Sequence, residues 1–289
     1  ELEAYGVERI YHPDDGMHMG LVEMIEDVVE RAARHRVETA LPGRPEPGDP
    51  AGIAHMLSAL EDEVFSAAEL ELKRREWLGH GPGAPVVGIT GTGGAGKSSV
   101  TDELLNRFGQ CFPDMKIAVL AVDPTRRRTG GALLGDRIRM NSLRNPNLYM
   151  RSMATRRQHL ATSAILQDAI TFLRSTGFDL VIVETAGIGQ SDSEIVDMVD
   201  FPVYVMTSDF GAQSQLEKID MLDFADLVAI NKFDRKGAED AYRDVCKQMQ
   251  RNREAFSAAA DEMPVFGSIA SRFNDDGTTA VYQEILARL

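Results

Sequence analysis

Cysteines are few and long hydrophobic runs are absent in this sequence, and these shortages exclude several kinds of protein. Only two cysteines, Cys111 and Cys246, occur among 289 residues, and neither has a second cysteine nearby. A disulfide framework is therefore excluded, and we expect a reducing, cytoplasmic location. No apolar run approaches the ~18 residues of a membrane span, and the N-terminus has no signal peptide. We therefore expect no association with a membrane.

Basic residues are also scarce relative to acidic ones. The 31 lysines and arginines stand against 45 aspartates and glutamates, which gives a net charge of -14. This balance disfavours binding to nucleic acid or to an anionic membrane surface. It still permits a phosphate ligand that a few groups bind locally. The six histidines are scattered, and no pair has metal-ligand spacing with a third partner.

The chain carries enough apolar residues for a substantial core, since 43% of its residues are hydrophobic. We expect three parts, residues 1–35, 36–84 and 85–289. In the first part, residues 6–11 resemble a strand, 12–16 carry turn residues, and apolar residues then recur at helical spacing. One strand and one helix cannot bury a core alone, so this part is expected to end a domain that begins upstream.

The middle part begins as a linker. Residues 41–50 include four prolines, which favour a semi-extended spacer. From Ile53 to Leu70, apolar residues follow the three-and-four spacing of an amphipathic helix. The sequence predicts one helix that runs to about Leu78 and packs on the domain that follows.

From residue 86 onward, short apolar runs alternate with helix-like segments. This alternation predicts an α/β fold, with a mainly parallel sheet and helices on both of its faces. The expected strands are residues 86–89, 117–122, 180–183, 202–206, 227–230 and 264–266. The expected helices are residues 98–108 and 161–173, with a final helix that begins near residue 281.

The first motif with chemical meaning is a glycine-rich turn between an apolar strand and a helix. Its glycines allow backbone conformations that a Cβ atom resists, so successive N–H groups can point at a triphosphate. The N-terminus of the helix adds a favourable dipole. Lys97 is expected to reach the β and γ phosphates, and the Ser98 hydroxyl to bind Mg²⁺. The residues expected to bind nucleotide here are Gly91, Gly93, Gly94, Ala95, Gly96, Lys97, Ser98 and Ser99.

The second motif is an apolar strand that ends in Glu184, with Gly187 three residues later. A carboxylate at this position can hold Mg²⁺ directly or through water, or it can orient the attacking water as a base. The Gly187 N–H is expected to contact the γ-phosphate, so this segment would move on hydrolysis. The alternative is a charge that only solvates the end of a strand.

Two further carboxylates, Asp123 and Asp136, flank a loop that contains glycines and arginines. Asp123 ends a strand, and the loop is expected to close over Mg²⁺ and the γ-phosphate as a switch. Alternatively, both are ordinary loop carboxylates. The arginines at 126–128 and at 156–157 would bind phosphates or an acidic partner, unless they are simply solvated.

The third motif, Asn231 to Asp234, directly follows a strand. Guanine presents an N1–H and an exocyclic amine on one edge, and the Asp234 carboxylate can accept both. Adenine lacks this pair of donors and would leave the carboxylate unpaired, which is costly. Asn231 is expected to brace the loop, and the Lys232 stem to lie along the base. The last strand is followed by residues expected to offer a backbone contact to guanine O6, namely Ser268, Ile269 and Ala270.

Together these motifs resemble those of the G-protein chaperones of adenosylcobalamin-dependent acyl-CoA mutases, such as methylmalonyl-CoA mutase. The resemblance covers roughly residues 53–275 and implies a phosphate-loop GTPase of the signal-recognition/MinD/BioD class. It also implies that residues 208–218 form a third switch that signals to the mutase. The catalytic residues it implies are Lys97, Glu184 and Asp136. The Mg²⁺ ligands it implies are Ser98, Asp123, Asp136 and Glu184.

Residues 1–35 are similar to the end of a cobalamin-binding, flavodoxin-like domain. The order of cobalamin domain and then G domain is similar to that of the fused isobutyryl-CoA mutases. The resemblance implies that this chain binds GTP or GDP with Mg²⁺, while adenosylcobalamin is bound by the parent or partner mutase. It implies mutase and cobalamin-binding partners in cis or in trans, a homodimeric parent, and a GTPase that gates cofactor loading and protection.

Three other functions remain open at this stage. A nickel-insertion chaperone GTPase would need a Cys/His cluster, which is not visible in the sequence. A phosphotransferase would pass the phosphate to a small molecule or protein instead of to water. A passive docking module would bind nucleotide only for stability, and it would not need Glu184.

Overall fold

The computed structural model describes residues 7–38, 45–81, 83–124, 140–155, 159–185, 195–211, 216 and 219–289, with the side chains at 35–38, 123–124, 154–155 and 159–163 outside this description. The chain divides into two compact units, Glu1–Gly43 and Arg44–Leu289. Among the described residues, no helix is both long and apolar enough to cross a membrane.

The described part of the first unit, residues 7–38, contains one helix, α1 (Pro13–Glu38), which is kinked at Gly20. The strand expected at 6–11 is wrong for residues 7–11, which form no strand, and the turn expected at 12–16 is wrong because the helix begins there. Proline suits the first helical position, and the acidic residues after it favour the helix N-terminus. The helix leaves a set of apolar side chains at least half exposed: Met17, Leu21, Val22, Ile25, Val28 and Val29.

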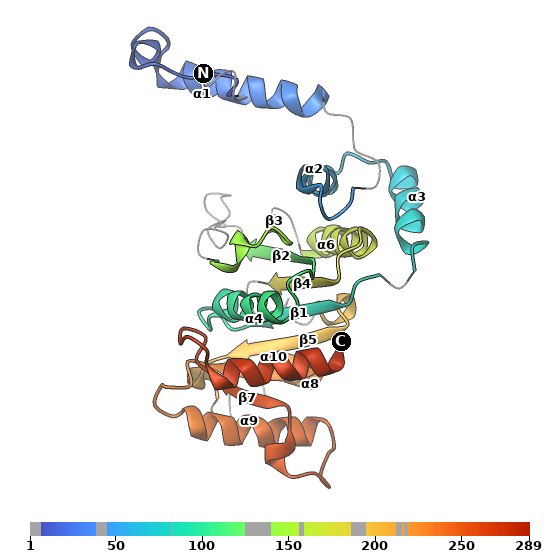
Figure 1. Ribbon diagram of the computed structural model, residues 1–289, viewed down its shortest axis with the longest axis vertical. Coiled ribbons are helices and arrows are strands. Elements are labelled where there is room, and N and C mark those ends of the chain that lie inside the picture. The colour runs from blue at the N-terminus through green and yellow to red at the C-terminus, as the bar shows by residue number, and fades with distance from the viewer. Residues whose placement is uncertain are drawn as a thin grey trace. The chain divides into compact units, whose positions relative to one another are not determined.

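The second unit is built on a seven-stranded sheet in which every pair of neighbouring strands is parallel (Figure 1). The strand order is β3-β2-β4-β1-β5-β6-β7. The strands are β1 (Val86–Gly91), β2 (Ile117–Pro124), β3 (Leu148–Thr155), β4 (Leu180–Thr185), β5 (Phe201–Met206), β6 (Leu227–Asn231) and β7 (Val265–Ser268).

Helices cover both faces of this sheet. The helices are α2 (Pro50–Glu61), α3 (Ala67–Leu78), α4 (Lys97–Cys111), α6 (His159–Ser175), α8 (Met221–Phe224), α9 (Ala238–Asn252) and α10 (Asp276–Arg288). Helices α4 and α10 pack in one buried cluster, and α2 and α6 pack in another. A third cluster joins α8 and α9 to the strands β5, β6 and β7.

The alternation of side chains along each strand explains why both faces are covered. In β2, Ile117 and Val119 belong to the α4 face, whereas Ala118 and Leu120 belong to the α6 face. All four are fully buried. A parallel sheet that is buried on both sides reads as a continuous apolar run in sequence, which is why these strands were predictable.

The expected α/β architecture is therefore confirmed, but the long helix expected from Ile53 to Leu78 is wrong. The chain breaks it into α2 and α3, because Glu63 adopts a left-handed conformation with φ of 54°. Ser66 then starts α3 through a reciprocal capping box with Glu69. The final helix begins at Asp276, five residues earlier than expected, and β3 and α9 were not anticipated.

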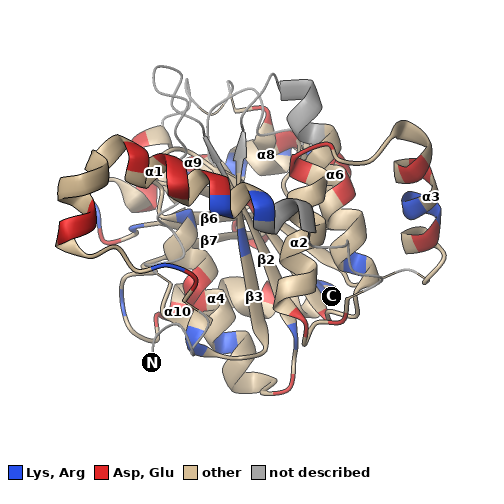
Figure 2. Cartoon of the chain, turned by 90° about the horizontal axis from the view of Figure 1, so that it is seen from above, with Lys and Arg blue, Asp and Glu red and all other residues tan. Residues whose placement is uncertain are grey.

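Acidic and basic residues share the same helices in this unit. Figure 2 shows both signs side by side on α3. One such charge holds two elements together, since the Arg74 guanidinium on α3 donates to both oxygens of Asp168 on α6, at 2.6 and 2.8 Å. These hydrogen bonds raise the pKa of Arg74.

Candidate nucleotide-binding site

The predicted phosphate loop lies at the carboxyl end of β1, between this strand and α4. Gly91, Gly94 and Gly96 adopt positive φ values of 145°, 75° and 89°. A Cβ atom on Gly91 would lie 1.8 Å from the Val205 carbonyl oxygen of the neighbouring strand. The loop thus needs glycine both for its conformation and for its close approach to β5.

Lys97 opens α4 and is buried. Its ammonium donates to the carbonyl oxygens of Gly91 and Thr92, at 3.0 and 3.2 Å. The charge is therefore held within the loop, next to the N–H groups of the first turn of α4. The Thr92 hydroxyl is buried and has no hydrogen-bonding partner among the described residues. A buried cation and an unpaired hydroxyl in one loop suit a polar, anionic ligand.

Glu184, at the end of β4, meets the start of α4. The Ser98 hydroxyl donates to its Oε1 at 2.6 Å, and the Thr101 hydroxyl is 2.9 Å from its Oε2. The register of the sheet brings them together, because Glu184 pairs with Ile89, two residues before the phosphate loop begins. Only 6% of Glu184 is exposed, so this carboxylate is buried at the base of the site.

This oxygen-rich corner fits a magnesium ion. A serine hydroxyl and a carboxylate are the oxygen donors that Mg²⁺ prefers. The described side chains contain no group of three or more acidic, histidine or cysteine ligands. Nucleotide phosphates and water would therefore complete the coordination shell beside Ser98 and Glu184, as Mg²⁺ usually requires.

The base-recognition loop after β6 is tied directly to the phosphate loop. The Asn231 side-chain amide donates to the Ala95 carbonyl oxygen at 2.8 Å, and the Lys232 ammonium donates to the Gly94 carbonyl oxygen at 2.7 Å. Lys232 has a positive φ of 59°, which turns the chain sharply after the strand. The two motifs, more than 130 residues apart in sequence, thus form one continuous surface.

Asp234 is exposed on this loop, and among the residues that the structure describes no hydrogen bond to its carboxylate occurs. The preceding residue, Phe233, fixes the loop, because its N–H donates to the Ser268 carbonyl oxygen at 3.0 Å. The ring of Phe233 covers Gly267, where a Cβ atom would lie 2.5 Å from it. The backbone that carries Asp234 is therefore positioned by the contacts of Phe233 with Ser268 and Gly267.

The segment Ser268 to Ala270 lies beside Asn231, as expected for a guanine-binding loop. The Ala270 N–H donates to Asn231 Oδ1 at 3.0 Å, and the Ile269 N–H donates to Asp275 Oδ2 at 3.0 Å. Both donors are thus engaged inside the protein. A contact from either to guanine O6 would require sharing or exchange of these hydrogen bonds, and it stays a prediction.

Asp275 organises this loop and was not anticipated from the sequence. One of its carboxylate oxygens accepts hydrogen bonds from the N–H groups of Ile269 and Thr278 and from the Thr278 hydroxyl. Burial tends to raise the pKa of Asp275, but these hydrogen bonds outweigh burial and hold the pKa below its usual range. An aspartate three residues before Thr278 is a helix-capping signal that the sequence does contain.

Several predicted residues remain untested by the geometry. Asp136 and Gly187 lie outside the described residues, and so does the side chain of Asp123. The backbone of Asp123 lies near the carboxyl end of β2, two residues after Ala121, which pairs with Glu184 of β4. Gly93 and Ser99 are exposed. Thr101, which is fully buried, was missed, although its helical spacing from Lys97 and Ser98 places it on the same side of α4.

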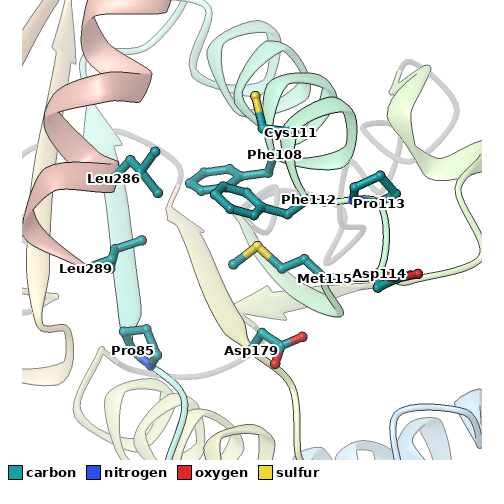
Figure 3. Close-up of a pocket in the computed structure, with 10 residues that line it drawn as sticks. All are labelled: Pro85, Phe108, Cys111, Phe112, Pro113, Asp114, Met115, Asp179, Leu286 and Leu289. Atoms are coloured by element: carbon teal, nitrogen blue, oxygen red, sulfur yellow. The ribbon is translucent and has the colours of Figure 1, made fainter.

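A separate cavity of about 790 Å³ lies at the end of the sheet where the strands begin, opposite the phosphate loop (Figure 3). Its walls include Phe108 and Phe112 at the end of α4, and Leu286 and Leu289 at the end of the chain. Pro85, which precedes β1, also contributes. Because its walls come from the beginnings of strands and the ends of helices, this cavity is distinct from the phosphate loop.

Comparison with known proteins decides the family. Residues 61–285 match the family described as "Methylmalonyl Co-A mutase-associated GTPase MeaB". The chain belongs to this family. It is therefore a MeaB-type GTPase domain.

Longer relatives carry the same domain. The chain is 53% identical, over its whole length, to 26% of a fused isobutyryl-CoA mutase from Cupriavidus metallidurans. It is 50% identical, over 98% of its length, to 27% of the protein with the same name from Geobacillus kaustophilus. The chain thus spans about a quarter of the length of these relatives.

A solved structure supports the fold. The crystal structure described as an LAO/AO transport system kinase is 22% identical, with a TM-score of 0.57. The match covers 83% of this chain and 71% of that one. At this identity the likeness concerns the fold alone.

Proposed function

We propose that this MeaB-type domain hydrolyses GTP and uses the nucleotide state to gate adenosylcobalamin loading and protection of an acyl-CoA mutase. The observation that carries the proposal is the Ser98–Glu184 contact of 2.6 Å at the start of α4. It joins the residue expected to bind Mg²⁺ to the carboxylate expected to act at the γ-phosphate. A domain that only bound nucleotide would not need a carboxylate placed to orient the attacking water.

In this proposal, each described residue has one task in phosphoryl transfer. Lys97 exchanges its two carbonyl partners for oxygens of the β and γ phosphates. Glu184 orients the attacking water or the metal shell, and Ser98 holds the metal. Mg²⁺, when bound, neutralises charge on the phosphate oxygens. The remaining expected contributors are Asp123, Asp136 and Gly187.

Guanine selectivity is assigned to Asp234. Its exposed carboxylate can accept from N1–H and from the exocyclic amine of guanine. Asn231 and Lys232 support this role because they fix the base loop against the phosphate loop through Ala95 and Gly94. The two linked loops would then hold the base and the phosphates at a fixed separation.

We propose that the mutase partner is supplied in cis. The relatives named as fused isobutyryl-CoA mutases are about four times as long as the matched segment, which supports a longer parent polypeptide. Adenosylcobalamin would be bound there and not by this chain alone. A homodimeric parent and a cytoplasmic location belong to the same proposal.

The proposed domain boundaries, 1–35, 36–84 and 85–289, follow the same logic. Helix α1 exposes a row of apolar side chains that water does not favour. We propose that the first part completes an upstream cobalamin-binding domain, which would cover this row. The second part then links that domain to the GTPase domain.

Labelled GTP tests the chemistry directly. We expect the γ-phosphate to appear as inorganic phosphate, with no labelled acceptor. Replacing Glu184 by Gln should slow hydrolysis roughly 100-fold or more while GDP affinity changes little, because this carboxylate serves the γ-phosphate end. The exposed Glu76 on α3 is the matched control, and Glu76→Gln should hydrolyse at the wild-type rate. A labelled acceptor would replace the GTPase proposal by a phosphotransferase.

A further inference from the structure

We propose that Thr101 is a positioning residue, which holds the Glu184 carboxylate in its working orientation during GTP hydrolysis. The inference rests on the proposed role of Glu184 and adds a specific contributor to it. Thr101 lies outside the glycine-rich motif and outside the strand motif that ends in Glu184. Its helical spacing puts it on the same side of α4 as Lys97 and Ser98, and the fold brings Glu184 to it.

Two acceptors lie within hydrogen-bonding distance of the Thr101 hydroxyl. Its oxygen lies 2.9 Å from Glu184 Oε2 and 3.1 Å from the Lys97 carbonyl oxygen. The hydroxyl has one proton, so it donates to one of them at a time or is shared between them. Thr101 is 0% exposed, and water therefore does not replace the bond when it breaks.

The two oxygens of Glu184 face different partners. Ser98 occupies Oε1, and Thr101 occupies Oε2. Ser98 would hold Mg²⁺ through its hydroxyl oxygen, and if its proton then left Oε1, that oxygen would be free to face the reacting water or the metal shell. The bond from Thr101 to Oε2 can persist through this exchange. A carboxylate that is held at one oxygen presents the other in a fixed direction.

The backbone geometry of α4 supports a fixed role for this contact. Lys97, Ser98 and Thr101 occupy the first two turns of one helix, so their relative positions are set by the helix itself. Glu184 is the penultimate residue of a strand buried between β1 and β2. Both sides of the contact therefore belong to rigid elements and not to loops.

The decisive variant is Thr101→Val, which keeps the shape of the side chain and removes its hydroxyl. We expect kcat for GTP hydrolysis to fall roughly tenfold to 100-fold, the range for one hydrogen bond to a charged group. The affinity for GDP should change less than about threefold, since the contacts of the Thr101 hydroxyl are with Glu184 and with a backbone carbonyl oxygen of α4. Thr101→Ser restores the hydroxyl and should recover most of the activity.

The matched control removes a similar hydroxyl elsewhere. Thr171 on α6 bonds the Gln167 carbonyl oxygen four residues earlier, as Thr101 bonds that of Lys97. Thr171→Val should therefore leave kcat unchanged. If Thr101→Val lowered GDP affinity and kcat together and Thr101→Ser failed to rescue, the role would be structural and the inference would be overturned. Wild-type kcat in Thr101→Val would overturn it equally.

A double-mutant cycle separates this inference from the proposed function. In the Glu184→Gln background, Thr101→Val should have little further effect on kcat, because the group it positions has already been disabled. Full activity in Glu184→Gln would contradict the proposed function itself. Slow hydrolysis in Glu184→Gln, combined with additive loss from Thr101→Val, would contradict only the positioning role.

Discussion

At the scale of single residues, Gly96 shows how two distant motifs constrain one position. It has a φ of 89°, and a Cβ atom there would lie 2.6 Å from the Asn231 amide nitrogen. That nitrogen donates to Ala95, so a side chain at 96 disturbs the brace between the phosphate loop and the base loop. Gly94 shares the positive φ of 75°, but a Cβ atom on it would meet nothing within 4 Å.

These two glycines allow conformational strain and steric contact to be measured separately. Gly94→Ala carries only the cost of a left-handed alanine, about 1 kcal/mol. Gly96→Ala carries this cost and also displaces Asn231, so we expect GDP affinity to fall at least about tenfold further than in Gly94→Ala. Calorimetry of both variants with GDP tests this. Equal losses would mean that Asn231 does not brace the nucleotide site.

Individual side chains at the candidate site differ in how far the sequence predicted them. Lys97, Ser98 and Glu184 were predictable because each occupies a fixed offset from a glycine-rich turn or from the end of an apolar strand. Thr101 was not found, because its partner Glu184 lies 83 residues away and the contact depends on how the strands are ordered. Asp275 was overlooked, although its capping spacing to Thr278 is present in the sequence. Local spacing predicts which residues can act, whereas the tertiary fold determines which of them meet.

At the scale of elements, the start of α10 and the segment Ser268–Ala270 form one unit around Asp275. Because its folded pKa is lowered, the stability that Asp275 contributes is fully present above the unfolded pKa, near 4. It is lost as the pH falls through the folded pKa. Asp275→Asn should lower the free energy of unfolding by about 1 kcal/mol at pH 7, and this difference should shrink below about pH 4.

Urea unfolding of wild type and Asp275→Asn between pH 3 and 7 measures this difference. Asp276→Asn is the control, since Asp276 is exposed in the same first turn of α10. Its effect reports on the helix dipole without the buried hydrogen bonds. If the difference in the free energy of unfolding between wild type and Asp275→Asn stayed constant down to pH 3, the charge of the carboxylate would not be what stabilises the fold.

Elements differed in how well the sequence predicted them. The buried strands were evident as apolar runs, but β3 mixes Arg151 and Ser152 with apolar residues at the sheet edge and was missed. The break between α2 and α3 depends on a left-handed Glu63, which no apolar spacing signals. The Ser66–Glu69 capping box, in contrast, was present in the sequence and could have revealed where α3 starts.

At the scale of the whole molecule, the nucleotide site is positioned to influence the segment after β5. The Thr92 N–H in the phosphate loop donates to Val205 in β5, and β5 leads into a short 3₁₀ turn, Ser208–Phe210. Asp209 in this turn pairs with Arg235 of the base loop at 3.4 Å. The described start of the expected third switch, 208–218, thus contacts the base loop and continues directly from a strand bound to the phosphate loop.

We therefore expect nucleotide-dependent cofactor transfer in the proposed full-length fused polypeptide. Adenosylcobalamin transfer to the mutase, measured with GDP, GTP and a non-hydrolysable GTP analogue, should differ between the three states if the γ-phosphate orders the switch segments as proposed. Gln213→Ala and Lys218→Ala, at positions outside the described residues, should reduce this difference and leave GTP affinity unchanged. By linkage, the mutase must in turn alter nucleotide affinity. Identical transfer in all three states, with unchanged hydrolysis, would show a GTPase that is not coupled to its mutase.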